Sequence, residues 1–429
     1  MARSGWREPK ALSPARTLTV RIETIGSGGD GVAHDEGKTL YTAMTAPGDL
    51  AVVEARGDRG RLLELIERSP LRADPPCRHF GDCGGCALQH LAPAEQARWK
   101  QAQVSEALAR ERVVAGRIHP ILTMPAASRR RAVFAATAEK AARCFGFNER
   151  RSHRVVAIAA CDILSPPLSA RLEALRALAA IVPAPAFDVA VTACDNGLDV
   201  NFAAPKLSPH SLLERRDLAA RLHDARIVRL SVNGEPVMTL SPPSVLFDGV
   251  AVAPPPGAFL QASREGEAAL IGLVKAAAEG ARKIADLFSG CGTFALPLAK
   301  SASVSAIDSD RAAIEALKRA ASAAQASTAP IHPLHAEVRD LFERPLTAKE
   351  LKKFDLAVFD PPRAGAAAQA AEIAKSGVPR VVGVSCNQQS FARDASLLVA
   401  GGYRLLEVTP VDQFVYSPHI EIVGVFARE

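Results

Sequence analysis

The chain lacks an apolar run long enough to cross a membrane, and its first ten residues lack the apolar core that is typical of a secretory leader. No stretch of about 18 apolar residues occurs in its 429 residues, which argues against a membrane-spanning helix. Residues 1–10 contain Arg3, Arg7 and Lys10 but no apolar core, so we expect no signal peptide. These absences predict a cytoplasmic protein.

A strong excess of charge of one sign is also missing. The chain has 52 Lys and Arg against 46 Asp and Glu, a formal net charge of +6. A mildly basic balance fits a polyanionic partner such as nucleic acid but does not require one. Apolar residues make up 48% of the chain, enough to build a core in each of two or three domains.

Cysteines are few, and their spacing is informative. In a reducing cytosol they are more often metal ligands or catalytic groups than disulfide partners. Cys77-x5-Cys83-x2-Cys86 lies in a glycine-rich loop, and Cys161 follows later. Four thiolates of this kind suit zinc or an iron–sulfur cluster, and the spacing alone does not choose between them. The alternative is a tight loop in which small residues coincide.

Four segments are expected along the chain. Residues 14–70 contain short strands near 17–23, 38–43, 50–55 and 61–67, separated by Gly, Pro or Asp, which predicts a small β-barrel. Residues 71–92 hold the cysteine loop. Residues 93–258 mix helical patterns at 95–110 and 168–180 with strand patterns at 129–138, 143–147, 189–191, 198–202 and 228–232, which predicts a central α+β domain.

Residues 259–429 alternate regularly between helical and strand patterns. This alternation predicts a doubly wound, Rossmann-like α/β domain with a mainly parallel sheet. The expected strands are 283–288, 303–307, 331–335, 354–359, 379–385, 403–408 and 421–426.

A glycine-rich loop follows the first of these strands. Residues 286–293 read Asp-Leu-Phe-Ser-Gly-Cys-Gly-Thr, and Gly290 and Thr293 lie where a ligand can approach the backbone at a helix start. The spacing is not Gly-x-Gly-x-x-Gly, so a dinucleotide is disfavoured. Asp308 follows the next strand and could accept ribose hydroxyls, and Asp340 could accept an adenine amino group. The set resembles the S-adenosylmethionine (SAM) site of class I methyltransferases.

A thiol lies at the end of another expected strand. Cys386 follows residues 379–385, and ligand crevices lie at this edge of α/β sheets. A thiolate near a methyl donor indicates addition to carbon 6 of a pyrimidine. Glu421, expected on the neighbouring strand, is the best candidate for the base that removes the proton from carbon 5. Asp360 could bind the uracil N3–H or position the thiol, and Arg363 could grip a phosphate or stabilise negative charge.

Basic and aromatic residues alternate in the central segment. Arg129, Arg130 and Arg131 precede Phe134, and Arg143 lies beside Phe145 and Phe147. Such a surface suits the phosphates and unstacked bases of RNA. The alternative is a solvated basic face over an ordinary apolar core.

Four motifs together resemble the RNA uracil-5 methyltransferase family. They are Ser385-Cys386-Asn387, Asp360-Pro-Pro-Arg363, Phe259-Leu-Gln261 and His419-x-Glu421. The resemblance runs from about residue 17 to the carboxyl terminus and is closest to the bacterial 23S rRNA branch. That branch has an amino-terminal, oligonucleotide-binding-like TRAM barrel and a [4Fe-4S] cluster.

The resemblance implies roles for individual residues. Cys386 is the nucleophile and Glu421 the base, and Phe259 stacks on or near a flipped uracil. The four cysteines hold the [4Fe-4S] cluster, with zinc as the alternative. Ser263, Gln388 and Thr293 depart from the family pattern without removing a chemical group. The residues expected to line the SAM and base pocket are Gln261, Phe288, Asp308 and Asp360.

Other functions remain open at this point. A tRNA uracil methyltransferase would use the same chemistry, and the barrel and cysteines favour 23S rRNA over tRNA. A DNA cytosine methyltransferase is disfavoured because its nucleophile lies in a Pro-Cys loop after a different strand. A non-catalytic SAM-binding rRNA assembly factor would not need both Cys386 and Glu421. A monomer is expected for an enzyme that acts on a large RNA.

Overall fold

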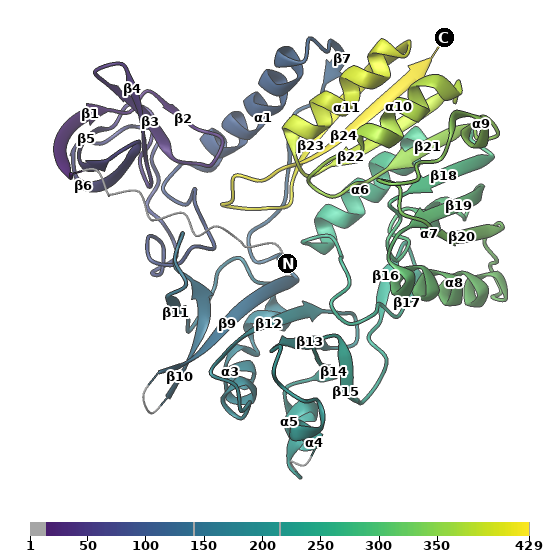
Figure 1. Ribbon diagram of the computed structural model, residues 1–429, viewed down its shortest axis with the longest axis horizontal. Helices are drawn as coiled ribbons and strands as arrows, with labels where there is room; N and C mark the ends of the chain where they lie inside the picture. Colours follow the sequence, from purple (N-terminus) through teal and green to yellow (C-terminus); the bar gives the residue numbers. More distant parts are fainter. Residues whose placement is uncertain (1–13, 140–141, 214–215, 429) are drawn as a thin grey trace, which may run out of the picture. The chain divides into compact units, whose positions relative to one another are not determined.

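The computed structural model describes residues 14–139, 142–213 and 216–428 (Figure 1). The segment 1–10, on which the expectation about a leader rests, lies outside these residues. The chain forms two compact units. Unit 1 is Met1–Trp99 with Tyr416–Pro418, and unit 2 is Lys100–Val415 with His419–Glu429. Within the described ranges, no helix combines the length and the apolar character needed to span a bilayer.

Unit 1 is built on a six-stranded sheet that curls around its own core (purple in Figure 1). Its spatial order is β1-β5-β6-β4-β3-β2. Alternate residues of β5 point inward, so that Ala51, Val53 and Ala55 meet Val20 and Leu40. The predicted β character of this part is confirmed, and β2 and β3 are strands that the sequence analysis did not predict. The bounds are β1 Arg16–Arg21, β2 Thr24–Ile25, β3 Gly31–Asp35, β4 Lys38–Thr42, β5 Leu50–Arg56 and β6 Arg59–Glu67.

The central part of unit 2 is a seven-stranded sheet in the order β11-β10-β9-β12-β13-β14-β15. All neighbours are antiparallel except β13 and β14. Helices α3 and α5 pack on it, which confirms the predicted α+β character. Its elements are β9 Arg131–Glu139, β10 Ala142–Asn148, β11 Val155–Ala157, α2 Pro166–Ser169, α3 Leu172–Ala180, β12 Ala186–Ala193, β13 Leu198–Ala203, α4 His210–Leu213, α5 Leu218–Asp224, β14 Ile227–Val232 and β15 Glu235–Thr239.

The remainder of unit 2 is a nine-stranded sheet, here called the large sheet. Its order is β20-β19-β18-β21-β22-β24-β23-β7, and β8 also pairs with β23. The seven strands β18 to β24, numbered in chain order, therefore lie as 3-2-1-4-5-7-6, and only β24 runs against the others. The predicted doubly wound domain is confirmed. Its strands are β18 Lys283–Leu287, β19 Ser303–Asp308, β20 Leu334–Val338, β21 Leu356–Phe359, β22 Arg380–Ser385, β23 Tyr403–Asp412 and β24 Glu421–Arg428.

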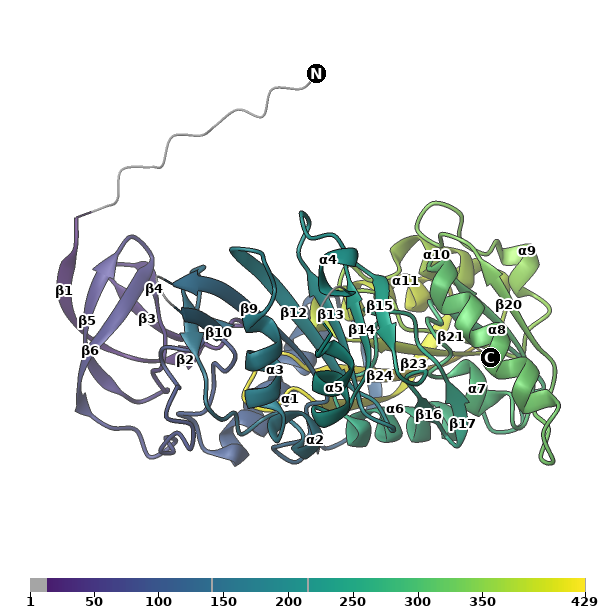
Figure 2. The ribbon, with the colours of Figure 1, turned by 90° about the horizontal axis from the view of Figure 1, so that it is seen from below.

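Helices cover both faces of the large sheet (Figure 2). Alternate strand residues feed two separate cores, because successive side chains of a strand point to opposite faces. Ile284 and Val358 join the core beneath α6, α7 and α8. Ala285 and Phe359 join the core beneath α1, α10 and α11. The remaining elements are α1 Pro93–Arg110, β7 Ala115–Ile118, β8 Leu122–Thr123, β16 Val245–Phe247, β17 Val250–Val252, α6 Arg264–Ala277, α7 Ala295–Leu298, α8 Arg311–Gln325, α9 Ala348–Leu351, α10 Ala367–Ser376 and α11 Gln388–Ala400.

Candidate active site

The glycine-rich loop leaves β18 with an unusual backbone. Phe288 has φ +63°, and Gly290 and Gly292 have φ +52° and +96°. A non-glycine residue in this region costs free energy and is found most often at functional sites. A Cβ added to Gly290 would meet no protein atom within 4 Å, whereas one added to Gly292 would lie 2.5 Å from Leu317 Cδ1. The loop is thus packed on one side and open on the other, as a ligand cradle requires.

Carboxylates at the ends of the next strands border this loop. Asp308 Oδ2 accepts from Gly290 N at 2.8 Å, and Oδ1 accepts from Asp310 N at 2.8 Å. Each oxygen keeps a lone pair that a ribose hydroxyl could use. Asp340 accepts from Phe342 N through Oδ1 at 2.8 Å. Phe342 was not among the predicted site residues; its ring centroid lies 5.4 Å from that of Phe288, and the side chain is 47% exposed.

The thiol and the proposed base come from neighbouring strands. Ser385 of β22 pairs with Ile422 of antiparallel β24. Cys386 directly follows the last residue of β22, and Glu421 is the first residue of β24. Asn387 begins α11 directly after the thiol, and its Oδ1 accepts from Gln389 N and Ser390 N. The predicted proximity of the two strands is confirmed, and it brings the two residues to the same end of the sheet.

The ionisable groups around Cys386 influence one another. Burial, Glu421 and Asp360 raise the pKa of the Cys386 thiol to about 11, and Arg363 opposes this shift. Burial raises the pKa of Asp360 to about 7, while the Gln261 amide opposes it. Burial and Asp360 raise the pKa of Glu421 well above its usual range. Its Oε2 has no hydrogen-bond partner among the described residues. Such perturbed carboxyl groups are typical of proton-transfer sites.

The acidic Pro-Pro loop is held from behind by α11. Asp394 is buried, and its Oδ2 accepts from Ala366 N at 2.6 Å. Arg393 donates to the carbonyl of Ala364 at 2.8 Å and to Asp394. These contacts fix the backbone after Arg363, whose side chain is exposed beside the site. The loop therefore presents Asp360 and Arg363 from a rigid support.

Of the three adjacent arginines predicted to contact RNA, residues 129–131, the middle one is buried. Arg130 is 2% exposed, pairs with Glu267 of α6 and donates to the Gln261 carbonyl. The predicted RNA contact through Arg130 does not fit this structure, because the guanidinium is buried and fully engaged. Arg131 donates to the Leu260 carbonyl at 2.8 Å and stacks over the Phe259 ring at 5.1 Å. Phe259 is 70% exposed.

Arg129 and Arg131 lie where solvent still reaches them. Both are partly exposed, and Arg129 Nε donates to the Arg131 carbonyl at 3.1 Å. Burial, Arg130 and Arg129 lower the pKa of Arg131 to about 10. Arg130 and Arg131 thus hold the start of β9 against the Phe259–Gln261 segment, while Arg129 and Arg131 stay partly exposed.

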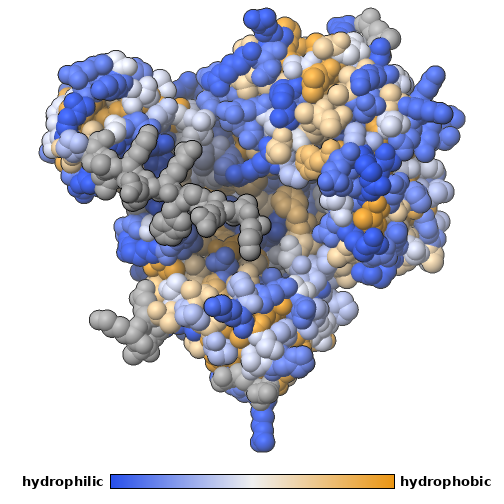
Figure 3. Space-filling view, viewed as in Figure 1, coloured by the Kyte–Doolittle hydropathy of each residue, from blue (hydrophilic) through white to orange (hydrophobic). Residues whose placement is uncertain are grey.

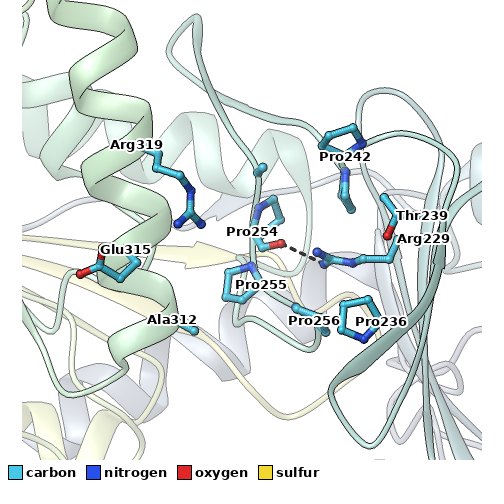
Figure 4. Close-up of a pocket in the computed structure, with 12 residues that line it drawn as sticks. Arg229, Pro236, Thr239, Pro242, Pro254, Pro255, Pro256, Ala312, Glu315 and Arg319 are labelled. Carbon is cyan, nitrogen blue, oxygen red and sulfur yellow. Dashed lines mark hydrogen bonds between the residues drawn. The ribbon is translucent and has the colours of Figure 1, made fainter. Parts of the chain in front are cut away.

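A proline-rich linker, residues 254–256, leads into the Phe259–Gln261 segment. Hydrophilic residues cover the molecular surface over α8 (Figure 3). Beside α8 lies a hollow of about 360 Å³, and its wall includes Pro254, Pro255 and Pro256 (Figure 4). Arg229 pairs with Asp199 and donates to the Pro254 carbonyl at 2.9 Å. This buried pair anchors the linker that carries Phe259, a role the sequence did not reveal.

The cysteine loop lies in unit 1. Cys77, Cys83 and Cys86 are partly buried, and Cys83 Sγ accepts from Gly85 N at 3.4 Å. Burial and, to a smaller extent, Cys77 raise the pKa of Cys83. Cys161 belongs to unit 2. Across the residues that the structure describes, no group of three or more His, Cys, Asp or Glu side chains is arranged to hold a metal. The predicted cluster is therefore not shown.

Known proteins match this chain over almost its whole length. The family model described as tRNA (Uracil-5-)-methyltransferase matches residues 256–429. An uncharacterized RNA methyltransferase of Rhizobium meliloti (strain 1021) is 42% identical over 420 residues, which cover 96% of this chain and 100% of the relative. The 23S rRNA (uracil(1939)-C(5))-methyltransferase RlmD of Pectobacterium atrosepticum is 32% identical over 438 residues, 97% of this chain and 95% of the relative.

A solved structure shares the fold. It is the tRNA (uracil-54, C5)-methyltransferase of Pyrococcus abyssi in complex with S-adenosyl-L-homocysteine, with a TM-score of 0.72 and 23% identity over 96% of this chain and 100% of that chain. The large sheet and its strand-end site define a class I SAM-dependent methyltransferase fold. Within that class, the chain belongs to the RNA uracil-5 methyltransferase family.

Proposed function

We propose that this protein methylates carbon 5 of uracil in 23S rRNA through a covalent bond between Cys386 and carbon 6. The observation that carries the proposal is the pairing of β22 with β24 up to Ser385 and Ile422, the residues next to Cys386 and Glu421. Glu421 also acts electrostatically on the Cys386 thiol. Similarity to the 23S rRNA enzyme over nearly the full chain supports the choice of RNA. The absence of a long apolar helix among the described residues is compatible with action in the cytoplasm.

The open side of the glycine-rich loop fits SAM. Gly290 leaves space beside the backbone, and Asp308 has spare acceptor capacity for ribose hydroxyls. Thr293 precedes the short helix α7, Gln261 donates to Asp360, and Asp360 acts electrostatically on the Cys386 thiol. Phe288 and Phe342 offer aromatic faces for adenine, with Asp340 as an acceptor for its amino group. Bound SAM supplies the methyl group.

The protein side chains perform the remaining steps. Cys386 gives its proton to water, and its thiolate bonds to carbon 6, which moves the electrons of the C5–C6 double bond to carbon 5. After carbon 5 has gained the methyl group, Glu421 takes the proton from carbon 5. The electrons of that C–H bond form the C5–C6 double bond, and the S–C6 bond breaks to return the thiolate. Arg363 favours the thiolate because its positive charge lowers the pKa of Cys386.

Binding of the uracil base would use groups from the Phe259–Gln261 segment, the loop at residues 360–363 and the start of β9. Phe259 presents an exposed ring for stacking, supported from behind by Arg131. Asp360 can accept from the uracil N3–H or position the thiol. Arg129, Arg131 and Arg363 remain candidates for phosphate contacts.

A tRNA substrate is the second candidate. The family description that matches residues 256–429 names tRNA, and the chemistry would be unchanged. A non-catalytic assembly factor would have no chemical use for both the Cys386 thiol and the Glu421 carboxylate.

RNA containing 5-fluorouridine tests this proposal, because a fluorine at carbon 5 cannot leave as a proton and the adduct is trapped. We expect a covalent complex with a 23S rRNA transcript and SAM on a denaturing gel, and none with Cys386→Ala. A complex with tRNA transcripts alone would favour the second candidate. Absence of an adduct with either RNA, while SAM still binds, would overturn the enzymatic proposal.

Unit 1 is proposed to be a TRAM-like RNA-binding barrel, and Cys77, Cys83, Cys86 and Cys161 to hold a [4Fe-4S] cluster, with zinc as the alternative. The cluster proposal rests on cysteine spacing and family resemblance. Anaerobic purification followed by iron, sulfide and zinc assays would decide it: iron and sulfide in equal amounts support the cluster, zinc supports the alternative, and neither would contradict both. We expect the protein to sediment as a monomer.

A further inference from the structure

A buried glutamine lies between the proposed base and the SAM-binding segment. Gln413 follows β23 and is 2% exposed. Its Nε2 donates to Glu421 Oε1 at 3.1 Å and to Gln261 Oε1 at 2.7 Å. Gln261 Nε2 in turn donates to Asp360 Oδ2 at 3.2 Å. A continuous chain of hydrogen bonds therefore joins the two carboxylates that flank Cys386.

One backbone amide determines which end of each glutamine side chain donates and which accepts in this series of hydrogen bonds. Ala262 N donates to Gln413 Oε1 at 3.0 Å. An amide N–H requires an oxygen acceptor, so the Nε2 group of Gln413 must face Glu421 and Gln261. The oxygen of Gln261 then faces Gln413, and its nitrogen faces Asp360. Both carboxylates consequently receive N–H donors, which stabilise their ionised forms against burial.

Gln413 has little freedom to move. Its neighbours in sequence are held by the buried Lys100, which donates to Asp412 Oδ1 at 2.6 Å and to the Phe414 carbonyl at 3.1 Å. On the opposite side α6 packs closely: a Cβ on Gly266 would lie 2.7 Å from Gln413 Cβ and 2.8 Å from its Oε1. Only glycine leaves room for the glutamine side chain at this point.

We propose that Gln413 is a positioning residue for the last step of the reaction, the removal of the proton from carbon 5. Gln413 holds Glu421 through Oε1, which leaves Oε2, the oxygen without a partner, as the one that takes the proton. The inference rests on the proposed function. It predicts that loss of Gln413 slows proton removal more than methyl transfer, so that the methylated RNA stays attached to Cys386.

The main test compares Gln413→Met with the wild type on a 23S rRNA transcript labelled with [5-³H]uridine, in the presence of SAM. Methionine has a similar size but cannot form the three hydrogen bonds. We expect tritium release to slow by about 10- to 100-fold, as for other misplaced catalytic groups. Methyl transfer in a single turnover should change by less than about threefold, and a covalent protein–RNA complex should accumulate on denaturing gels.

Two glycines of α6 provide a matched pair. Gly266→Ala introduces a methyl group against Gln413 without touching a reacting group, whereas Gly272→Ala meets nothing within 4 Å. We expect Gly266→Ala to accumulate the complex and Gly272→Ala to behave as the wild type. Accumulation in neither Gly266→Ala nor Gln413→Met would overturn the proposal.

The pH profile provides a readout that a packing defect would not move. Asp360, Arg363 and Cys386 also act on Glu421, and these groups are unchanged in Gln413→Met. Loss of the donated N–H should raise the pKa of Glu421 further, so the acid limb of tritium release should move to higher pH. Tritium release equal to that of the wild type at all pH values would reject the positioning role. A wild type that forms no adduct and releases no tritium would instead reject the proposed function.

Discussion

At the scale of single residues, more carboxyl groups than cations surround Cys386. Asp360 and Glu421 are held in a confined space, and burial raises the pKa of both. Asp286 is completely buried, and burial together with Asp360 raises its pKa as well. The exposed Arg363 offsets part of this charge. These carboxyl groups are therefore more basic than ordinary ones, which suits groups that exchange protons during a reaction.

Asp360→Asn tests this protonation balance. The folded-state pKa of about 7 lies above the unfolded value near 3.8, so the native state binds the extra proton and stability falls as pH rises through this window. Asn removes the charge but keeps an acceptor for Gln261. We expect equal stability to the wild type at pH 4 and a gain of about 1–3 kcal/mol at pH 8 in urea unfolding.

Asp355→Asn is the matched control for that measurement. Backbone N–H groups of Arg282 and Lys283 lower the pKa of Asp355. Its charged form is therefore the favoured one, and the variant should lose stability at pH 8 while differing little at low pH. The same sign for both variants would contradict our account of Asp360.

At the scale of elements, the turn after β18 combines two kinds of glycine. Gly292 is enclosed by Leu317 and Leu296, whereas Gly290 faces open space. Both have positive φ. Gly292 is required for packing of the loop against α8, and Gly290 for access of a ligand to the backbone.

These two glycines should respond differently to alanine. Gly290→Ala should cost about 1–2 kcal/mol of stability for the left-handed backbone and weaken SAM binding, because its methyl group enters the open side. Gly292→Ala should cost about 3 kcal/mol or more, because strain and overpacking add. Urea unfolding and calorimetric titration with SAM measure the two effects. Equal losses of stability in both variants would contradict the distinction.

The elements around the site were largely predictable from sequence. Buried parallel strands such as Arg380–Ser385 are continuous apolar runs, and each is followed by a helical pattern, so type and order could be read directly. Short edge elements were missed: Ala115–Ile118 joins the large sheet through a partner almost 300 residues away in the chain, Leu405, and no local pattern records that pairing. Strand Leu334–Val338 begins three residues later than expected.

At the scale of the whole unit 2, a buried ion pair links the central sheet to the large sheet. Arg130 precedes β9 and Glu267 lies in α6, and both are almost fully buried. Its partner is 137 positions away, so the Arg-Arg-Arg sequence alone resembled a surface cluster. The same reason explains why Gln413 and Phe342 were missed, since their roles depend on contacts distant in sequence.

A double-mutant cycle should reveal this link. Arg130→Ala leaves Glu267 buried without its partner and should cost about 3–5 kcal/mol in urea unfolding. The combination Arg130→Met with Glu267→Leu should recover most of that loss. The slope of RNA affinity against salt concentration should remain unchanged in the double variant, because Arg130 contacts no phosphate in our account. A reduced slope would restore Arg130 as an RNA contact.

The amide of Ala262 has a consequence for how this site tolerates change. The atom that orients both glutamines belongs to the main chain, and the residue is already alanine, so side-chain scanning would pass over it. Small residues could replace one another at position 262 without disturbing the carboxylates, and proline alone would remove the N–H. The orientation of the two glutamine side chains, and so the N–H groups offered to the two carboxylates, thus depends on a backbone N–H that every amino acid except proline supplies.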